Sequence, residues 1–332
     1  MGEGVIGMNV VELEPGVVLG FGGTNARRGI ANDGEIEQFQ SVPTPTQPNE
    51  FFGWLGRQLL DSAEQGYEWT VAGAPGPVSE DGAMVGPVVN VPGLSKAQFN
   101  IRENLAAADP AVERMLSNGD HILVVKNDGP LAAHAAATKI GRFGYNRVAA
   151  LILGTGVGAG IVIRDPAYAN VYRDESTNPA EIGHIPLSED PLDTFENTVS
   201  GTALGRYLNE TYKKVEDLPK DHPAWKVVGT YAGRMATSLS LMNGVELVVP
   251  TGGVGAGASH KYGPHMADML STFAAFGNGT QRLFTPEIKL VPPSMSQIFE
   301  LYGGEGVMRD FMTSQQASVP VNQQAQPAEL TS

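Results

Sequence analysis

The segment Gly20-Phe21-Gly22-Gly23-Thr24-Asn25 follows the apolar run Val17–Leu19 and precedes a second strand-like stretch, Ala26–Ile30. A glycine turn that closes a strand lets backbone N–H groups approach phosphate oxygens without a side chain in the way. One such turn is weak evidence, because most glycine pairs are ordinary turns. Taken alone, the segment is compatible with both a plain turn and a phosphate-binding loop.

Two further glycine turns follow apolar strands later in the chain. Gly154-Thr155-Gly156 comes after Val148–Leu153, and Gly252-Gly253 comes shortly after Val245–Val249. Two of the three turns carry a threonine, whose hydroxyl group can bind phosphate. Three glycine turns in the same setting are hard to explain as ordinary turns, so the set predicts a phosphate-binding site.

The order strand, glycine turn, strand occurs twice, at Val17–Ile30 and at Leu151–Ile163, which predicts two similar halves. A length of 332 residues also favours two domains. We expect a small N-terminal α/β domain at residues 1–125, completed by a C-terminal helix near 298–313, and a large α/β domain at 126–297. Residues 314–332 are rich in Gln, Ser, Ala and Pro and are predicted to be a disordered tail.

Composition restricts the classes of function. The net charge of -14 disfavours nucleic-acid binding, which needs lysine and arginine against the phosphates. No apolar run approaches the ~20 residues of a membrane span. Residues 1–15 lack a basic start followed by an apolar stretch, so we expect a cytoplasmic protein. The absence of cysteine excludes disulfides, thiolate metal ligands and a cysteine nucleophile.

Asn127-Asp128 lies at the end of a predicted strand and before a predicted helix. A carboxylate in this place can accept the proton of a substrate hydroxyl that attacks phosphorus. The alternative is a helix cap, in which the side-chain oxygen accepts free backbone N–H groups. The dipeptide alone favours the cap, and neighbouring residues can fill both roles.

Glu181-Ile182-Gly183-His184 and, further on, Glu196 gather hydrogen-bonding groups in a short region. Carboxylates and a histidine can select among the hydroxyl groups of a sugar, although a surface loop with ordinary charged residues explains the pattern equally well. His184 has no Cys or His nearby at metal-ligand spacing, and no G-x-S-x-G serine elbow occurs. We therefore expect neither a metal site at His184 nor a serine hydrolase.

In their order along the chain, these segments resemble the ROK family of bacterial sugar kinases and related repressors, including its glucokinases. The likeness runs from Val17 to about Phe311. Beyond the motifs already quoted, it includes Pro75-Gly76-Pro77-Val78, Asn90-Val91-Pro92-Gly93, Val157-Gly158 after the second turn, and Ser200-Gly201 after Glu196. Each motif is short, but the ordered series is specific.

The resemblance implies two α/β domains of the actin/hexokinase type (a ribonuclease H-like fold) with an interdomain cleft, in which a hexose is phosphorylated by ATP and Mg²⁺. Asp128 would be the general base. The sugar, with glucose as first candidate, would be held by Gly76, Asn90, Asn127, Asp128, Glu181, His184 and Glu196. The nucleotide would be held by Gly22, Gly23, Thr24, Asn25, Gly154, Thr155, Gly156, Gly252 and Gly253. Family members often form homodimers, and the choice of hexose and of ATP against polyphosphate stays open.

The chain departs from the family pattern in two places. The family usually carries Asp two residues before the first glycine of the Gly-Gly-Thr turn, where it helps to organise Mg²⁺ and phosphates, and Gly20 stands there. Because that carboxylate stabilises the transition state, the alternative function is a weak or inactive sugar-binding or sensing protein.

The second departure is the missing zinc cluster of many family members. The stretch Ile185–Phe195 contains no cysteine, so we expect no structural zinc and expect Pro186, Pro191 and Leu192 to hold the loop by packing. The sequence also argues against a transcription repressor of the ROK type. Only 21 residues precede Gly22, which is too few for a helix-turn-helix, and the chain is acidic.

Overall fold

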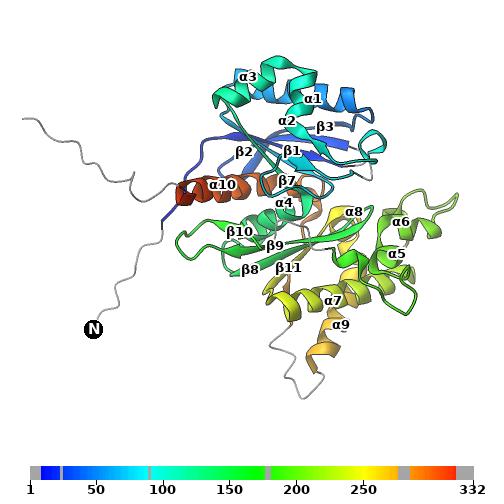
Figure 1. Ribbon diagram of the computed structural model, residues 1–332. Coiled ribbons are helices and arrows are strands. Elements are labelled where there is room, and N and C mark those ends of the chain that lie inside the picture. Colours follow the sequence, from blue (N-terminus) through cyan, green and yellow to red (C-terminus); the bar gives the residue numbers. More distant parts are fainter. Residues whose placement is uncertain (1–8, 23–24, 89–90, 176–180, 276–284, 319–332) are drawn as a thin grey trace, which may run out of the picture.

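Two five-stranded sheets with helices around them make up the structure, a computed structural model that describes residues 9–22, 25–88, 91–175, 181–275 and 285–318. One sheet lies in the upper part of the molecule and the other in the lower part (Figure 1). The chain forms the upper sheet first and crosses to the lower sheet at helix α4 (Asp128–Ala135).

The first sheet has the order β3-β2-β1-β4-β7. Its strands are β1 (Gly16–Phe21), β2 (Asn25–Asn32), β3 (Glu35–Pro43), β4 (Trp69–Ala74) and β7 (Ile122–Asn127). β1, β2 and β3 are antiparallel neighbours, whereas β4 and β7 run parallel to β1. All six residues of β1 and of β4 are buried, which explains why these strands lack an alternating polar pattern.

The second sheet repeats this plan with the order β10-β9-β8-β11-β12. Its strands are β8 (Arg147–Leu153), β9 (Val157–Arg164), β10 (Tyr172–Asp174), β11 (Leu247–Thr251) and β12 (Glu287–Ile288). Three antiparallel strands are again followed by two parallel ones. The duplication inferred from the two strand–turn–strand segments is therefore confirmed, since β1–β2 and β8–β9 occupy equivalent places.

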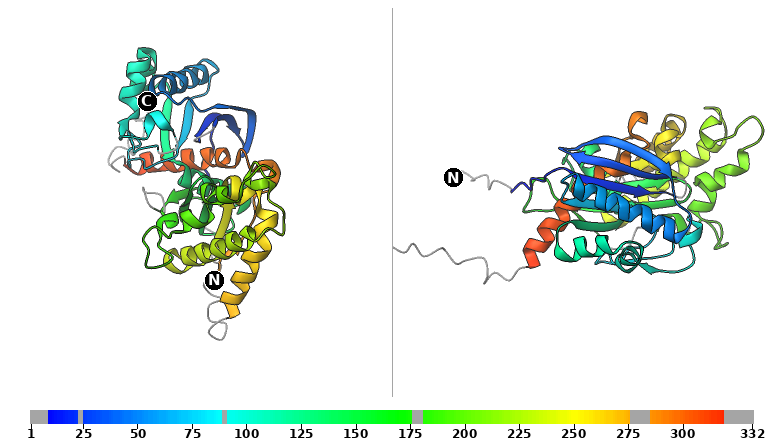
Figure 2. Two further views of the ribbon diagram at one scale, coloured as in Figure 1. Left: turned by 90° about the vertical axis from the view of Figure 1, so that its right-hand side faces the viewer. Right: turned by 90° about the horizontal axis from the view of Figure 1, so that it is seen from above.

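Three helices cover one face of the first sheet: α1 (Pro48–Glu64), α2 (Ile101–Ala108) and α3 (Pro110–Asn118) (Figures 1 and 2). Leu55 and Leu59 of α1 and Leu105 of α2 are fully buried in the core beneath them. Asn100 caps α2 by accepting a hydrogen bond from the N–H of Glu103 at 3.2 Å. The short pair β5 (Met84–Val85) and β6 (Phe99–Asn100) leads into this layer.

Between the two sheets lie α4, the π-helical turn that continues it (Ala136–Ile140), and the last helix, α10 (Gly304–Ser318) (Figure 1). The 3₁₀ helix η8 (Phe299–Gly303) directly precedes α10. Leu301 and Val307 pack against Val18 and Val71 of the first sheet, so the C-terminal part of the chain completes the core on this face of the first sheet. The domain boundaries at 125 and 297 stay predictions.

The remaining helices surround the second sheet. They are α5 (Phe195–Val199), α6 (Gly201–Leu204), α7 (Ala224–Asn243), α8 (Gly252–Gly257) and α9 (Ser259–Ala275), with short 3₁₀ turns at 182–184, 205–207, 215–217 and 293–295. The 3₁₀ turn at 92–94 lies instead beside the core of the first sheet. Trp225 and Tyr262 are fully buried in their core. Among the described helices, none combines the length and the apolar character that a bilayer crossing needs.

An ion-pair network joins the two sheets near the crossing. Lys126 on β7 contacts Asp174 on β10 with 2.5 Å between Nζ and Oδ2, and His134 on α4 contacts the other oxygen of Asp174 at 3.1 Å. Arg173 pairs with Asp165 and reaches Asp310 of α10 at 3.5 Å. Because two cations already face these carboxylates, we interpret the cluster as a structural junction.

Candidate active site

The parallel strands bring the predicted site residues to one edge of each sheet. In the first sheet, Gly20 pairs with Gly73, and Ala74 pairs with Asn127, so the turns after β1, β4 and β7 meet. In the second sheet, Thr251 of β11 pairs with Ile152 of β8. Ligands of open α/β sheets bind at such carboxyl ends.

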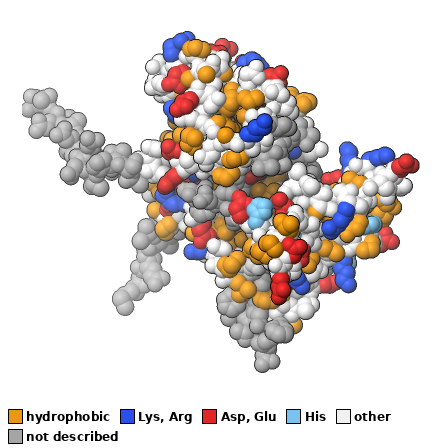
Figure 3. All heavy atoms as spheres, turned by 45° about the vertical axis from the view of Figure 1, so that its right-hand side comes forward, with side chains coloured by type: hydrophobic (Ala, Val, Ile, Leu, Met, Phe, Trp, Pro, Cys, Tyr) orange, Lys and Arg blue, Asp and Glu red, His pale blue; other side chains and the backbone are white. Residues whose placement is uncertain are grey.

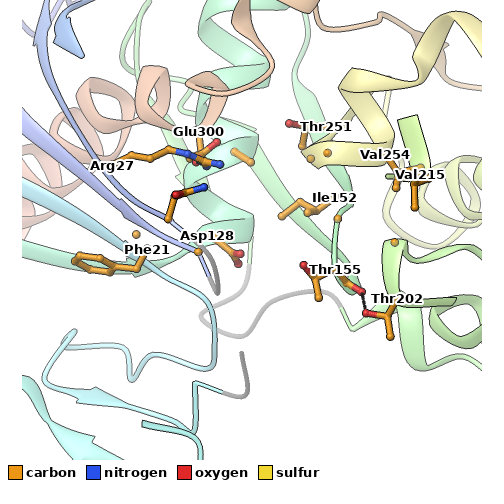
Figure 4. A pocket seen from close by; sticks show the side chains of 18 of the residues that line it. Phe21, Arg27, Asp128, Ile152, Thr155, Thr202, Val215, Thr251, Val254 and Glu300 are labelled. Carbon is orange, nitrogen blue, oxygen red and sulfur yellow. Dashed lines mark hydrogen bonds and ion pairs between the residues drawn. The ribbon is translucent and has the colours of Figure 1, made fainter. Parts of the chain in front are cut away.

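A cavity of about 730 Å³ opens between these two edges. Its walls come from both sheets: Phe21, Gly22, Asn25, Arg27, Gly73, Asp128, Leu131, Ala132, Ile152, Gly154, Thr155, Gly201, Thr202, Lys214, Val215, Glu216, Thr251, Gly252, Gly253, Val254 and Glu300. Figure 4 shows Arg27, Glu300 and Asp128 on one side and Thr155, Thr202 and Thr251 on the other. The volume suits a ligand of nucleotide size.

Seven residues predicted from the glycine turns and the Asn-Asp dipeptide line this one cavity: Gly22, Asn25, Asp128, Gly154, Thr155, Gly252 and Gly253. The other two residues of the first turn, Gly23 and Thr24, lie outside the described residues. Gly156 stands behind the wall, where an added Cβ would come within 2.7 Å of Glu196 Oε2. The three turns are therefore parts of one site.

Gly252 shows why the third turn needs glycine. It has φ +84°, a left-handed conformation that other residues avoid, and an added Cβ would lie 2.7 Å from the carbonyl oxygen of Leu153. This close approach holds the start of α8 against the end of β8. The backbone of Gly252 and Gly253 therefore forms the cavity wall without a side chain in between.

Asn127 and Asp128 divide the two roles that the sequence left open. Asn127 is the cap of α4, because its Oδ1 accepts the N–H of Gly129 at 2.8 Å. Its Nδ2 donates to the carbonyl oxygen of Gly76 at 2.8 Å, which fixes the loop after β4. Asn127, and not Asp128, is therefore the N-cap of α4, and the side chain of Asp128 faces the cavity (Figure 4).

The environment of Asp128 suits a base. Burial, followed by the negative charges of Glu300 and Glu181, raises the pKa of Asp128 from 3.8 to about 7. Hydrogen bonds from backbone N–H groups, the first from Gly129, act in the opposite direction. A carboxyl group that titrates near neutrality can take a proton from a hydroxyl and later release it.

The residues expected to hold a sugar lie in different environments. Gly76, at φ +153°, lies beside Asn127, whereas Asn90 lies outside the described residues. Glu181 and His184 contact each other at 3.6 Å, and the side chain of each is more than half exposed. Glu181 lies close enough to act on the charge of Asp128. Figure 3 shows acidic side chains around a histidine where the upper and lower parts of the molecule meet.

Val157, the first residue of β9, anchors two of these motifs. An added Cβ at Gly183 would lie 2.2 Å from the carbonyl oxygen of Val157, so the Glu181–His184 turn packs directly on the strand. Glu196 Oε2 accepts the N–H of Val157 at 2.8 Å. In this structure Glu196 therefore supports the Gly154–Gly156 turn, and its role toward a sugar stays a prediction.

The loop Ile185–Phe195 is held by hydrogen bonds. The N–H of Leu187 donates to the carbonyl oxygen of Asp193 at 2.7 Å, and a β-bridge joins Pro186 to Thr194. Pro186, Pro191 and Leu192 are exposed, with Leu192 at 73%. The expectation that packing of these three residues holds the loop is wrong, because the backbone of the loop pairs with itself.

Several cavity residues were not predicted from the sequence. Arg27 follows the first glycine turn by three residues on β2, and strand alternation could have indicated that it shares the side of Asn25. Glu300 and Lys214 offered no local signal, since each lies in a segment without a motif. Their positions depend on how distant parts of the chain pack.

The repeated strand order and the cavity between the sheets define the class of protein: an α/β protein with the two-domain actin-like fold of hexokinases. The chain belongs to the ROK family, whose sequence model matches residues 17–297.

Individual relatives agree with this assignment. A glucokinase of Streptomyces coelicolor is 28% identical over 207 residues, a match that covers 59% of this chain and 60% of the relative's own length. A ROK family glucokinase from Streptomyces griseus, solved with glucose and AMPPNP, superposes with a TM-score of 0.65 at 19% identity, covering 87% of this chain and 97% of that one. A ROK hexokinase from Thermus thermophilus gives 0.62 at 20% identity, covering 90% and 100%.

Proposed function

We propose that the chain is a sugar kinase that transfers the γ-phosphate of ATP to a hydroxyl group of a hexose, with glucose as the first candidate. The observation that carries the proposal is the placement of Asp128, which follows the cap residue Asn127 and faces a cavity lined by glycine turns of both sheets. The glucokinase relatives and the complex with glucose and AMPPNP support the choice of substrates.

In this proposal Asp128 accepts the proton of the sugar hydroxyl, and the oxygen of that hydroxyl forms a bond to the γ-phosphorus. The bond between that phosphorus and the bridging oxygen of ADP breaks in the same transfer, and ADP leaves with the electron pair. With a pKa raised to about 7, Asp128 titrates close to neutral pH, where a general base works best. The proton then passes from Asp128 to solvent.

The donor would lie along the cavity. Thr155 offers its hydroxyl group to phosphates, and Gly22 and Gly154 leave the wall free of side chains, while their N–H groups donate to the carbonyl oxygens of Asn25 and Gly156 within the turns. Gly252 and Gly253 border the end of the cavity near Glu216. Asp128 and Glu300, on the same side of the cavity, would present carboxylate oxygen atoms of the kind that Mg²⁺ prefers. When bound with ATP, Mg²⁺ neutralises charge on the phosphates.

Turnover of a panel of hexoses with ATP and Mg²⁺, and with polyphosphate as alternative donor, tests the proposal. Asp128→Asn should keep sugar binding and reduce turnover by ~10²-fold or more, because general-base catalysis contributes at least that much. Asp61→Asn, at an exposed position of α1, is the matched control and should retain full turnover.

Undiminished turnover in Asp128→Asn would remove Asp128 as the base. Sugar binding without ADP formation in the unmodified protein would favour the sensing alternative. At present that alternative has less support, because a second carboxylate, Glu300, stands beside the glycine that replaces the usual Asp.

A further inference from the structure

Gly20 does not leave an empty space where the family usually has an aspartate side chain. An added Cβ at Gly20 would lie 3.4 Å from Glu300 Oε1 and 3.6 Å from Glu300 Cγ. Atoms at these distances are in van der Waals contact. The carboxylate of Glu300 therefore occupies the surroundings into which a side chain at position 20 would extend.

The backbone that carries Glu300 is fixed firmly. Glu300 belongs to η8, and the next residue, Leu301, is fully buried against Val18 and Val71. An added Cβ at Gly29 of β2 would come within 3.3 Å of Leu301. The 3₁₀ helix thus lies directly on β1 and β2, and its packing directs Glu300 to the end of β1.

Arg27 fixes the side chain of Glu300. Arg27 is the β2 partner of Gly20 across the β1–β2 pair, and its guanidinium forms an ion pair with Glu300 Oε1 (Figure 4). Both side chains keep partial exposure, 27% and 21%, on the cavity side. Within the described part of the chain, Glu300 Oε2 has no hydrogen bond, so one carboxylate oxygen remains available.

We propose that Glu300 replaces the missing carboxylate of position 20: it enters the phosphate end of the cavity from η8 and orients the metal and the phosphates of the nucleotide. The proposal rests on the proposed kinase function for its physiological meaning. One negative charge thus remains beside the first glycine turn. It comes from a residue 280 positions later in the chain instead of from β1. Mg²⁺ takes one or two carboxylates and keeps several waters, so Glu300 can act directly or through water.

If Glu300 fills this role, restoring the family's aspartate at position 20 should not improve binding. Gly20→Asp alone would put a second carboxylate against Glu300 and compete for Arg27, and like charges in contact repel. Gly20→Asp in a chain that lacks the Glu300 charge would return a single carboxylate to this corner. Positions 20 and 300 should therefore show strong non-additivity, as expected for residues in contact.

Four proteins test this coupling: the unmodified chain, Gly20→Asp, Glu300→Gln and the double variant. Calorimetry measures AMPPNP affinity with Mg²⁺ and with EDTA, and electron paramagnetic resonance measures Mn²⁺ binding in the presence of AMPPNP. We expect Glu300→Gln to weaken metal-dependent binding by about 10-fold or more, with little change in EDTA. The double variant should regain most of that loss, whereas Gly20→Asp alone should show no gain.

Glu113→Gln on α3, an exposed position far from the cavity, is the matched control, and circular dichroism verifies that each variant is folded. Unchanged metal-dependent affinity in Glu300→Gln would overturn the proposal, as would Gly20→Asp improving affinity as much as the double variant does. Metal binding is read without turnover. If no hexose is phosphorylated but the coupling appears, the kinase function fails while the role of Glu300 stands.

Discussion

Glu196 Oε2 accepts a hydrogen bond from the backbone N–H of Val157 at 2.8 Å, and this bond connects α5 to the start of β9. The same oxygen lies 2.7 Å from the place where a Cβ at Gly156 would be. The carboxylate therefore stands directly behind the second glycine turn and leaves Oε1 for other partners. A residue expected at the sugar by family resemblance thus supports the second glycine turn, which lines the cavity.

Glu196→Ala should lower the free energy of unfolding by about 1–3 kcal/mol, because the N–H of Val157 loses its partner in a partly buried place. Nucleotide affinity should fall as well, since the Gly154–Gly156 turn loses its support. Urea unfolding and AMPPNP titration measure the two effects. The exposed Glu210→Ala is the control, and equal behaviour of the two variants would contradict the supporting role.

Activity should depend on pH through Asp128. Because burial and the charges of Glu300 and Glu181 raise the pKa of Asp128 to about 7, the base is protonated in acid, and kcat/KM should rise with pH up to about 7. Glu300→Gln removes one of the charges that raise this pKa, so the midpoint should move to lower pH. A profile that is flat from pH 5 to 8 would contradict the assignment of Asp128.

Asp128 should also oppose folding at high pH. The folded chain holds a proton on Asp128 from pH 3.8 to about 7, where the unfolded chain has lost it. Its contribution to stability is therefore complete below pH ~4 and is lost as the pH rises through about 7. At pH 8, Asp128→Asn should be more stable than the unmodified chain by roughly 1–3 kcal/mol, a range reduced for the partial exposure of the side chain. Thermal unfolding at pH 5 and 8 tests this, and equal differences at the two pH values would refute it.

Asn127 combines a helix cap with a contact to the loop of Gly76. Asn127→Ala should cost about 1–2 kcal/mol through loss of the cap and should also weaken sugar binding, because Gly76 loses the amide donor. Asn100→Ala is a matched control: it removes the cap of α2, away from the cavity, and should cost stability without changing sugar affinity. Sugar affinity that is equally unaffected in both variants would remove Asn127 from the sugar site.

Substitution by alanine should destabilise the fold at one glycine of β9 and leave its stability nearly unchanged at another. At Gly160 an added Cβ would lie 2.0 Å from the carbonyl oxygen of Gly129, so Gly160→Ala must push α4 and Asp128 away from the strand. At Gly158 no atom lies within 4 Å of the added Cβ. We expect Gly160→Ala to cost about 3 kcal/mol or more and Gly158→Ala to stay within about 0.5 kcal/mol, both by urea unfolding. Tolerance of Gly160→Ala would contradict this packing of α4.

Much of the fold was predictable because it depends on local patterns. The apolar runs at Val17–Leu19 and Val148–Leu153, each followed by a glycine turn, indicated the two equivalent sheets. Asn127-Asp128 was recognised as a junction of strand and helix. Which residue caps and which faces the cavity depends on the loop of Gly76, and that contact lies 51 positions away along the chain.

The rest of the site could not be read from local patterns. Glu300 reaches the cavity because Leu301 packs on the first sheet, and no short motif encodes a contact between positions so far apart. The exposure of Leu192 has a similar origin. Its apolar side chain suggested packing, but the backbone hydrogen bonds around it already close the loop.

The contribution of the chain's end to the first sheet has a consequence during synthesis. One face of that sheet can be covered by α1–α3 as soon as residue 125 has left the ribosome, since all of that core comes from residues 17–125. The opposite face, with Val18 and Val71, waits for Leu301 and Val307. Between about residue 125 and residue 301, a nascent chain therefore carries an apolar sheet face that its C-terminal part does not yet cover, and products truncated before residue 298 should be prone to aggregate.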